Sequence, residues 1–116
     1  MKLGYVNVFV SDLGRAVAFY RDVLGLHCTR EDRAFGYAAF TAGAISLGLA
    51  EVGPEQETLL ERHTGIGFVV EDLDAEHDRL AEAGVVFPMA PERQPWGGYM
   101  ALFADPDGNV FYLDQA

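Results

Sequence analysis

The feature of this sequence that most constrains its fold is an internal repeat. Residues 10–13 spell Val-Ser-Asp-Leu, and residues 70–73 spell Val-Glu-Asp-Leu. Each segment follows an apolar stretch and precedes a helical pattern that ends at a glycine, Gly25 in the first copy and Gly84 in the second. Similarity that recurs along a chain is the signature of repeated structural units. We therefore expect two diverged copies of one module.

Within each copy the apolar pattern predicts a strand and then a helix. The valines at positions 6, 8 and 10 share one face of residues 5–10, and the opposite face carries Tyr5, Asn7 and Phe9. Asp12 and Asp72 are placed to cap the helices that follow, because a carboxylate accepts from the free amides of a first turn. Apolar residues then recur at helical spacing over residues 13–24 and 73–80, which is typical of a helix packed on a sheet.

Three more strands are predicted after each helix. They span residues 27–32, 35–42 and 44–51 in the first copy, and residues 85–89, 98–104 and 109–114 in the second. The segment Asp105-Pro106-Asp107-Gly108 is a strong turn signal, and the prolines and glycines of residues 88–98 predict a loop over the sheet.

The predicted organisation is one domain over residues 1–116, with module one at 1–51, a polar linker at 52–63 and module two at 64–116. Its class is α+β, with two βαβββ modules forming a paired, curved, mixed-sheet cavity.

Composition narrows the possible partners and location. Eight basic against eighteen acidic residues give a net charge of −10, which repels nucleic acid and leaves a small molecule as the expected partner. No apolar run approaches the roughly 20 residues that cross a bilayer, and residues 1–12 lack a signal core, so we expect no membrane partner and a cytoplasmic location. The single cysteine, Cys28, is interpreted as a buried, inert thiol. The acidity either keeps the protein soluble or attracts a cationic ligand.

The motifs resemble those of the vicinal oxygen chelate superfamily, which holds glyoxalase I, extradiol dioxygenases, fosfomycin-resistance enzymes and bleomycin-binding proteins. The matching pieces are the Val-Ser-Asp-Leu segment running to Leu24-Gly25-Leu26, the Val-Glu-Asp-Leu segment running to Ala83-Gly84-Val85, and the turn that starts at Asp105. They cover almost the whole chain in the right order. The resemblance implies a glyoxalase/bleomycin-resistance-like fold, but one such scaffold hosts many chemistries.

Enzymes of that superfamily hold a divalent metal with one ligand from each of four inner strands, usually His, Gln or Glu. Counted from the motifs, the resemblance places these positions at Tyr5, Ser46, Gly65 and Tyr112. Sites for zinc, nickel, manganese or iron need nitrogen or carboxylate donors, so we expect no metal and no cofactor. His63 is interpreted as a polar residue at a strand mouth, although strict alternation would turn it inward.

The inner faces of the two sheets are expected to carry a small-molecule pocket. Small residues such as Ser46 and Gly67 leave room, while aromatic residues form walls, as is typical of a ligand site. The predicted ligand-binding residues are Tyr5, Asn7, Phe9, Ser46, Trp96, Tyr99, Tyr112 and Asp114. The alternative is that the aromatic residues fill a core and the glycines allow close approach of strands.

The leading hypothesis for function is a metal-free protein similar to the bleomycin-resistance branch, which sequesters an aromatic or cationic compound without turnover. The alternative is an enzyme of the glyoxalase type, a lyase, isomerase or dioxygenase-like member, that works without a metal or with an atypical one. Its acid or base would be Tyr5, Tyr112, Asp114 or His63. Short relatives usually form two-fold dimers, so the resemblance also implies a homodimer.

Overall fold

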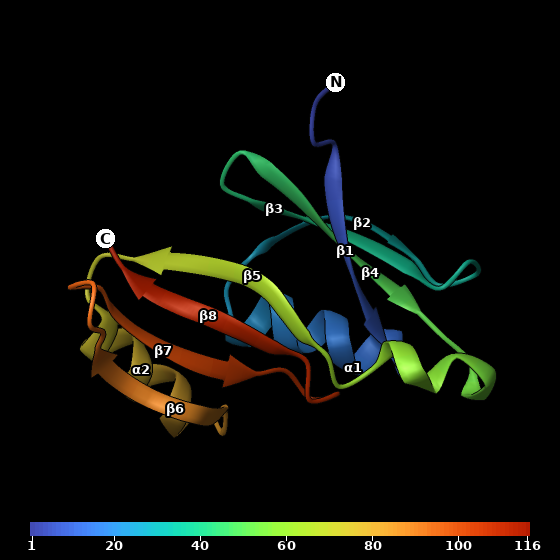
Figure 1. The fold of residues 1–116 in the computed structure, drawn as a ribbon. Helices are drawn as coiled ribbons and strands as arrows, with labels where there is room; N and C mark the ends of the chain where they lie inside the picture. Colours follow the sequence, from blue (N-terminus) through green and yellow to red (C-terminus); the bar gives the residue numbers. More distant parts are fainter. The chain divides into compact units, whose positions relative to one another are not determined.

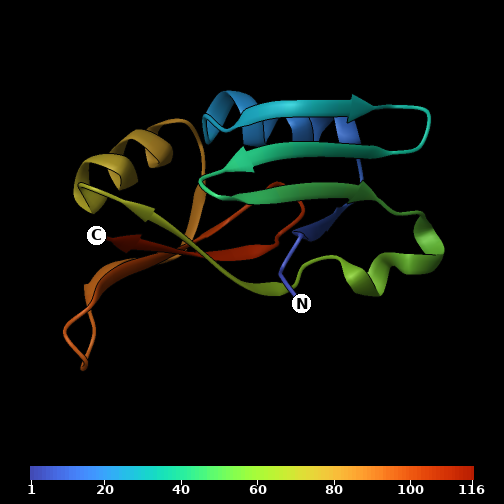
Figure 2. The same cartoon turned by 90° about the horizontal axis from the view of Figure 1, so that it is seen from above.

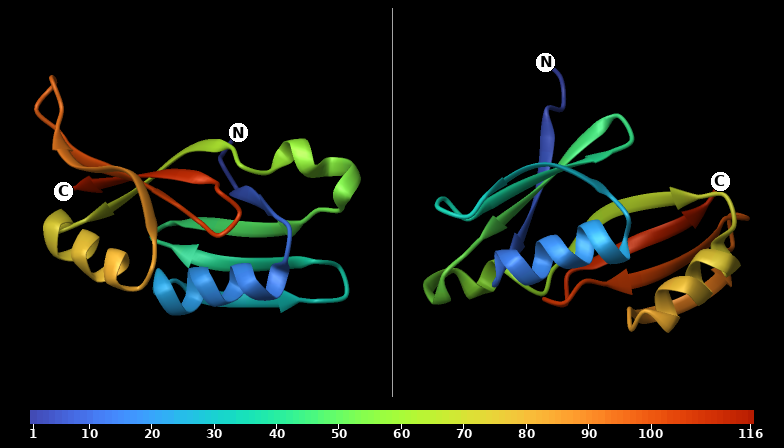
Figure 3. Two further views of the ribbon diagram at one scale, coloured as in Figure 1. Left: turned by 90° about the horizontal axis from the view of Figure 1, so that it is seen from below. Right: turned by 180° about the vertical axis from the view of Figure 1, so that it is seen from behind.

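The computed structural model describes residues 1–116 and divides into two units, Met1–Leu60 and Glu61–Ala116 (Figure 1). Each unit contains one copy of the sequence repeat as a four-stranded sheet with a helix against one face (Figures 2 and 3). The two-module α+β architecture predicted from the repeat is thereby confirmed. No helix in the structure is long and apolar enough to span a membrane.

The first unit follows the predicted order of one strand, one helix and three strands. Its elements are β1 (Tyr5–Val10), α1 (Leu13–Ala18), the π-helical η1 (Phe19–Val23), β2 (His27–Asp32), β3 (Tyr37–Ala42), β4 (Ile45–Glu51) and the 3-10 helix η2 (Pro54–Leu59). The sheet order is β1-β4-β3-β2, with β1 parallel to β4 and the other pairs antiparallel. The single helix predicted over residues 13–24 thus consists of α1 and a wider π-helical continuation, in which the Leu24 amide donates to the Phe19 carbonyl.

The second unit repeats this order. Its elements are β5 (His63–Val70), α2 (Leu73–Glu82), β6 (Val86–Arg93), β7 (Tyr99–Ala104) and β8 (Val110–Gln115). The sheet order is β5-β8-β7-β6, again with the first pair parallel. The same connectivity in both units confirms that the sequence repeat is a structural repeat.

The prediction that residues after 89 form a loop is wrong in part, because β6 continues to Arg93. Pro88 and Pro91 fall where the β6–β7 pairing is irregular, between Val86 and Met89 and between Met89 and Glu92. A proline lacks an amide proton, but an edge strand with bulges does not need one at those positions.

A separate apolar core forms between helix and sheet in each unit. In the first unit the inward valines of β1, Val8 and Val10, are buried with Val17 of α1 and Tyr20 of η1. In the second unit the core is aromatic, and the stacked rings of Phe103 and Phe111 lie 5.2 Å apart. The face of each sheet that carries no helix is consequently free to present functional side chains.

Candidate functional site

The helix-free face of the first unit carries the residues that alternation assigned to it. Tyr5 and Asn7 are exposed on β1, whereas their neighbours Val8 and Val10 are buried. Parallel pairing sets Tyr5 beside Ser46, and Asn7 beside Gly48 of β4. Phe9 follows on the same face and is half-buried. The predicted face is confirmed for this strand.

Tyr37 of β3 was not predicted, and it closes the centre of this face. Its hydroxyl lies 3.1 Å from Asn7 Oδ1, to which it donates a hydrogen bond. Gly48 makes the arrangement possible, because a Cβ at this position would lie 2.2 Å from Asn7 Oδ1 and 2.3 Å from the Tyr37 hydroxyl. The alternation of residues 37–42 was the signal that could have identified Tyr37, since Ala38 and Phe40 are the buried positions.

The helix-free face of the second unit is centred on β8. Tyr112 lies opposite Gly67 of β5, and Asp114 lies opposite Met100 of β7. A Cβ at Gly67 would stand 3.5 Å from Tyr112 Cβ and 3.6 Å from Asp114 Oδ2, so this glycine leaves open space beside both side chains. The His63 ring meets the Tyr112 ring edge-on at 4.9 Å, which places His63 on this face too.

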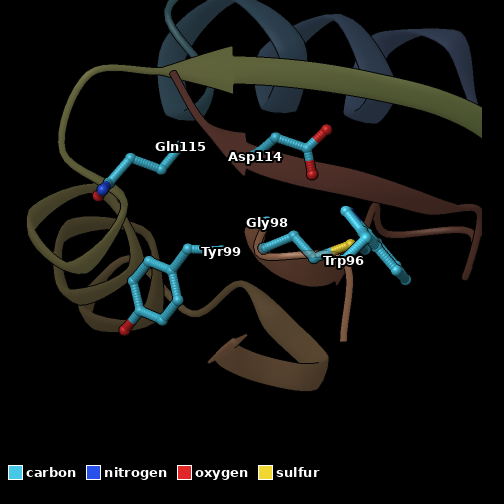
Figure 4. A pocket seen from close by; sticks show the side chains of 6 residues that line it. Trp96, Gly98, Tyr99, Asp114 and Gln115 are labelled. Carbon is cyan, nitrogen blue, oxygen red and sulfur yellow. The ribbon is translucent and has the colours of Figure 1, made fainter. Parts of the chain in front are cut away.

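A pocket of about 210 Å³ opens at one end of this unit (Figure 4). It is lined by Trp96, Gly98, Tyr99, Met100, Asp114 and Gln115. Three of the predicted ligand-binding residues, Trp96, Tyr99 and Asp114, therefore line one pocket. Met100 and Gln115 were missed, because their place in the pocket depends on the β7–β8 register and not on a sequence motif.

Trp96 stands at the tip of the β6–β7 hairpin and is 74% exposed. Its indole folds back over Gly98, since a Cβ on that glycine would lie only 2.7 Å from Trp96 Nε1. The hairpin is held by a hydrogen bond from the Arg93 guanidinium to the Gly97 carbonyl at 3.0 Å. An aromatic surface is thus kept at the pocket while remaining open to solvent.

Tyr99 lines the pocket, but its ring extends toward α2 (Figure 4). Its hydroxyl donates to Asp74 Oδ1 at 2.6 Å, and the Arg93 guanidinium lies 4.9 Å from the ring centre. The hydrogen bond to Asp74 raises the pKa of Tyr99 above its ordinary value, and partial removal from water and the negative charge of Asp74 add to this effect. Tyr99 therefore links the β6–β7 hairpin to α2, and its hydroxyl has Asp74 as its hydrogen-bond partner.

The eight predicted ligand-binding residues divide equally between the two units. Those of the first unit are Tyr5, Asn7, Phe9 and Ser46; those of the second are Trp96, Tyr99, Tyr112 and Asp114. Within the second unit, Tyr112 shares the helix-free face with Asp114. The assignment of all eight to ligand binding remains a prediction.

The four positions that the resemblance assigned to metal ligands offer unsuitable donors here. Tyr5 and Ser46 are register partners, but they supply only hydroxyl groups. Gly65 supplies no side chain, and Tyr112 supplies a phenol. No three His, Cys, Asp or Glu side chains gather closely enough in this structure to hold a metal ion. The residues present do not fit a divalent metal of the superfamily type.

Comparison with known proteins identifies the family that has this fold. The family model for the Glyoxalase/Bleomycin resistance protein/Dioxygenase superfamily matches residues 2–113. The uncharacterized protein YraH of Bacillus subtilis (strain 168) is 34% identical, with 97% of each chain covered.

Two solved structures extend the comparison. TnmS3, an antibiotic binding protein from Streptomyces sp. CB03234, is 30% identical with a TM-score of 0.82, covering 99% of this chain and 96% of its own. A superfamily member from Sphaerobacter thermophilus DSM 20745 is 26% identical with a TM-score of 0.83, covering 100% of this chain and 98% of its own. Since the family match spans nearly the whole repeat and the fold agrees, this chain belongs to the Glyoxalase/Bleomycin resistance protein/Dioxygenase superfamily.

Proposed function

We propose that this protein is a metal-free binder that sequesters an aromatic or cationic small molecule without converting it. The observation that carries the proposal is the pocket of the second unit, which Trp96, Met100 and Asp114 line together. An apolar surface with one well-placed polar group is the usual design of a small-molecule site. The unsuitable donors at Tyr5, Ser46, Gly65 and Tyr112 are the reason for proposing binding without a metal.

The comparison with TnmS3 supports this function. That protein is an antibiotic binding protein, and it matches this chain over nearly its full length at 30% identity. We extend ligand binding from it to this chain, and a role in antibiotic resistance is part of the proposal through the family match. In the second unit we propose that Trp96, Tyr99, Tyr112 and Asp114 contact the ligand, together with Met100 and Gln115 of the same pocket. For the first unit we propose ligand binding by Tyr5, Asn7, Phe9 and Ser46 separately.

We further propose that the acting form is a cytoplasmic homodimer. β1 and β5 are edge strands of the two sheets, as are β2 and β6, so the outer edge of each pairs with no strand of its own sheet. On β1, Tyr5 is 60% exposed, and Leu3 just before it is 70% exposed. Unpaired apolar edges are normally covered in proteins. Light scattering during size-exclusion chromatography tests this part, and a mass of one chain would contradict it.

The binding function is tested with the planar aromatic cation proflavine on protein treated with EDTA. Trp96 is the only tryptophan of the chain, so its fluorescence reports directly from the pocket. We expect saturable quenching at one probe per chain, and mass spectrometry should show unchanged proflavine after release. The variant Trp96→Phe, followed by calorimetry, should bind more weakly, because an aromatic–cation contact contributes on the order of 1 kcal/mol.

Two results would contradict the proposal. Absence of saturable binding in calorimetry would exclude a binder of this ligand class. Binding that requires added zinc or nickel would show that a metal site exists, and would favour the glyoxalase-type alternative. N-acetyltryptophanamide titrated in parallel corrects for light absorbed by the probe.

A further inference from the structure

Resting on the proposed function, we infer that the pocket of the second unit selects an organic cation, a protonated amine or a quaternary ammonium, and that Asp114 is the residue that determines this specificity. The inference narrows the ligand class from aromatic or cationic compounds to those that carry a positive charge. The carboxylate that pairs with this charge belongs to the second unit alone.

The Asp114 carboxylate is half-buried and has no protein partner. It forms no hydrogen bond and no ion pair in this structure, and its cross-strand neighbours are Met100 on β7 and Val69 on β5. The guanidinium of Arg93 donates to the Gly97 carbonyl and lies over the ring of Tyr99. A partly desolvated carboxylate among apolar groups costs free energy unless a cation pairs with it.

The structural repeat shows that this carboxylate is particular to the second unit. In the first unit Tyr37 pairs with Ala50, one step before the buried pair Ala38 and Leu49. In the second unit Met100 pairs with Asp114, likewise one step before the buried pair formed by Ala101 and Leu113. Asp114 is thus the counterpart of Ala50, and Met100 is the counterpart of Tyr37.

The same comparison shows that the equivalent place in the first unit is closed. There the Tyr37 side chain lies over Gly48 and is fixed by its hydrogen bond to Asn7. In the second unit a flexible thioether replaces the tyrosine, and the glycine at position 67 leaves space beside the carboxylate. The equivalent place in the first unit therefore carries no carboxylate, because Ala50 stands there, and the Tyr37 side chain fills it.

The lining of the pocket suits an ammonium group. An indole face attracts cations, a thioether is polarizable and adapts to the shape of its neighbour, and the carboxylate supplies the counter-charge. The net charge of −10 raises the local concentration of cations and repels anions. At about 210 Å³ the pocket is smaller than the roughly 300–1,000 Å³ of a site for a whole drug-sized molecule. It therefore fits a small amine or the charged end of a larger compound.

The test compares two planar three-ring probes of opposite charge, proflavine and 9-anthracenecarboxylate, by calorimetry at low and high salt. Wild-type protein should bind proflavine at least about tenfold more tightly than 9-anthracenecarboxylate. Asp114→Asn keeps the shape of the side chain and removes its charge, so it should weaken proflavine binding about tenfold and reduce the salt dependence. Its affinity for 9-anthracenecarboxylate should be unchanged or higher.

Glu82→Gln is the matched control, because it removes one negative charge from an exposed position on α2 outside the pocket. It should bind both probes as the wild type does. If Asp114→Asn unfolds at a lower temperature than the wild type, Asp114→Ser replaces it, and the same loss of proflavine affinity is expected.

The outcomes separate this inference from the proposed function. If wild type and Asp114→Asn bind proflavine equally, the cation inference is wrong while the binder proposal stands. The same conclusion follows if the anionic probe binds the wild type as tightly as proflavine does. If neither probe binds the wild type, both are wrong.

Discussion

Glu51 and Gln115 end equivalent strands of the two units, and each accepts a hydrogen bond from the first amide of the helix in its own unit. The Leu13 amide donates to Glu51 Oε2 at 2.7 Å, and the Leu73 amide donates to Gln115 Oε1 at 3.1 Å. The first amides of a helix lack partners within the helix. In both units, therefore, a side chain at the end of the last strand accepts from the first amide of the helix. The sequence motif at residues 10–13 and 70–73 contains the residue that donates this amide, but not the residue that accepts from it.

We predict that Glu51→Ala lowers the free energy of unfolding by about 1–2 kcal/mol, because it leaves the Leu13 amide without its acceptor. Glu51→Gln should lose less, since an amide oxygen serves the second unit at Gln115. Urea denaturation followed by circular dichroism measures both changes. The exposed Glu57 of η2 provides the control, and equal losses in Glu51→Ala and Glu57→Ala would contradict the role of Glu51.

A second prediction concerns the turn before β8, where Asn109 is 1% exposed. Its Nδ2 donates to Asp105 Oδ2 at 3.0 Å, and its Oδ1 accepts from the Arg62 amide at 3.2 Å. Asn109→Ala removes both bonds and leaves buried polar groups unsatisfied, so we expect a loss of about 2–3 kcal/mol.

Asp105→Ala should act through the same network, because Asp105 Oδ1 also accepts from the Asn109 amide at 2.9 Å. The double variant Asp105→Ala with Asn109→Ala should therefore lose less than the sum of the single losses. Chemical denaturation of all four proteins measures this. Simple additivity would mean that the two residues act independently.

The fold could be predicted because the sequence contains the signals of the same module twice. The caps Asp12 and Asp72 accept from the Arg15 and Ala75 amides as expected, and Gly25 and Gly84 adopt the positive φ of helix ends. These signals are local, so they can be recognised in the sequence without knowledge of tertiary contacts. The end of β6 was misplaced for the opposite reason, since whether a proline is tolerated in a strand depends on which neighbour the strand has.

The site was only partly predictable, because alternation assigns faces but not partners. Period two gave the correct face for Asn7 and Asp114. It could not show that Met100 lies opposite Asp114, since that register is set by the turn between β7 and β8. For Tyr99, alternation along β7 indicates the opposite face. The residue shares its parity with buried Ala101 and Phe103, so it faces the helix.

A third prediction follows from the raised pKa of Tyr99, whose ordinary value is 10.0. A group whose pKa is higher in the folded protein adds stability that is fully present below its unfolded pKa. This contribution is lost as the pH rises through the folded pKa. The stability difference between wild type and Tyr99→Phe should therefore be constant at neutral pH and shrink above about pH 10.

Absorbance at 295 nm, taken as the difference between wild type and Tyr99→Phe, isolates this phenol from the other four tyrosines of the chain. The midpoint of the difference should lie above 10.0, and Asp74→Asn should move it downward, since the Asp74 carboxylate is the main cause of the shift. A midpoint that Asp74→Asn leaves unchanged would show that the bond between Tyr99 and Asp74 does not persist in solution.

The final prediction concerns Gly98, which lets the Trp96 indole lie over the pocket. A Cβ at residue 98 would stand 2.7 Å from Trp96 Nε1, closer than real side chains approach, so Gly98→Ala should displace the indole. We expect stronger quenching of Trp96 by acrylamide and several-fold weaker binding of proflavine, with an unchanged melting temperature because the exposed indole contributes little to the core. Gly4→Ala is the control, since a Cβ there meets no atom within 4 Å. Unchanged quenching and affinity in Gly98→Ala would mean that the indole does not rest on Gly98 in solution, and that the aromatic wall of the pocket must come from elsewhere.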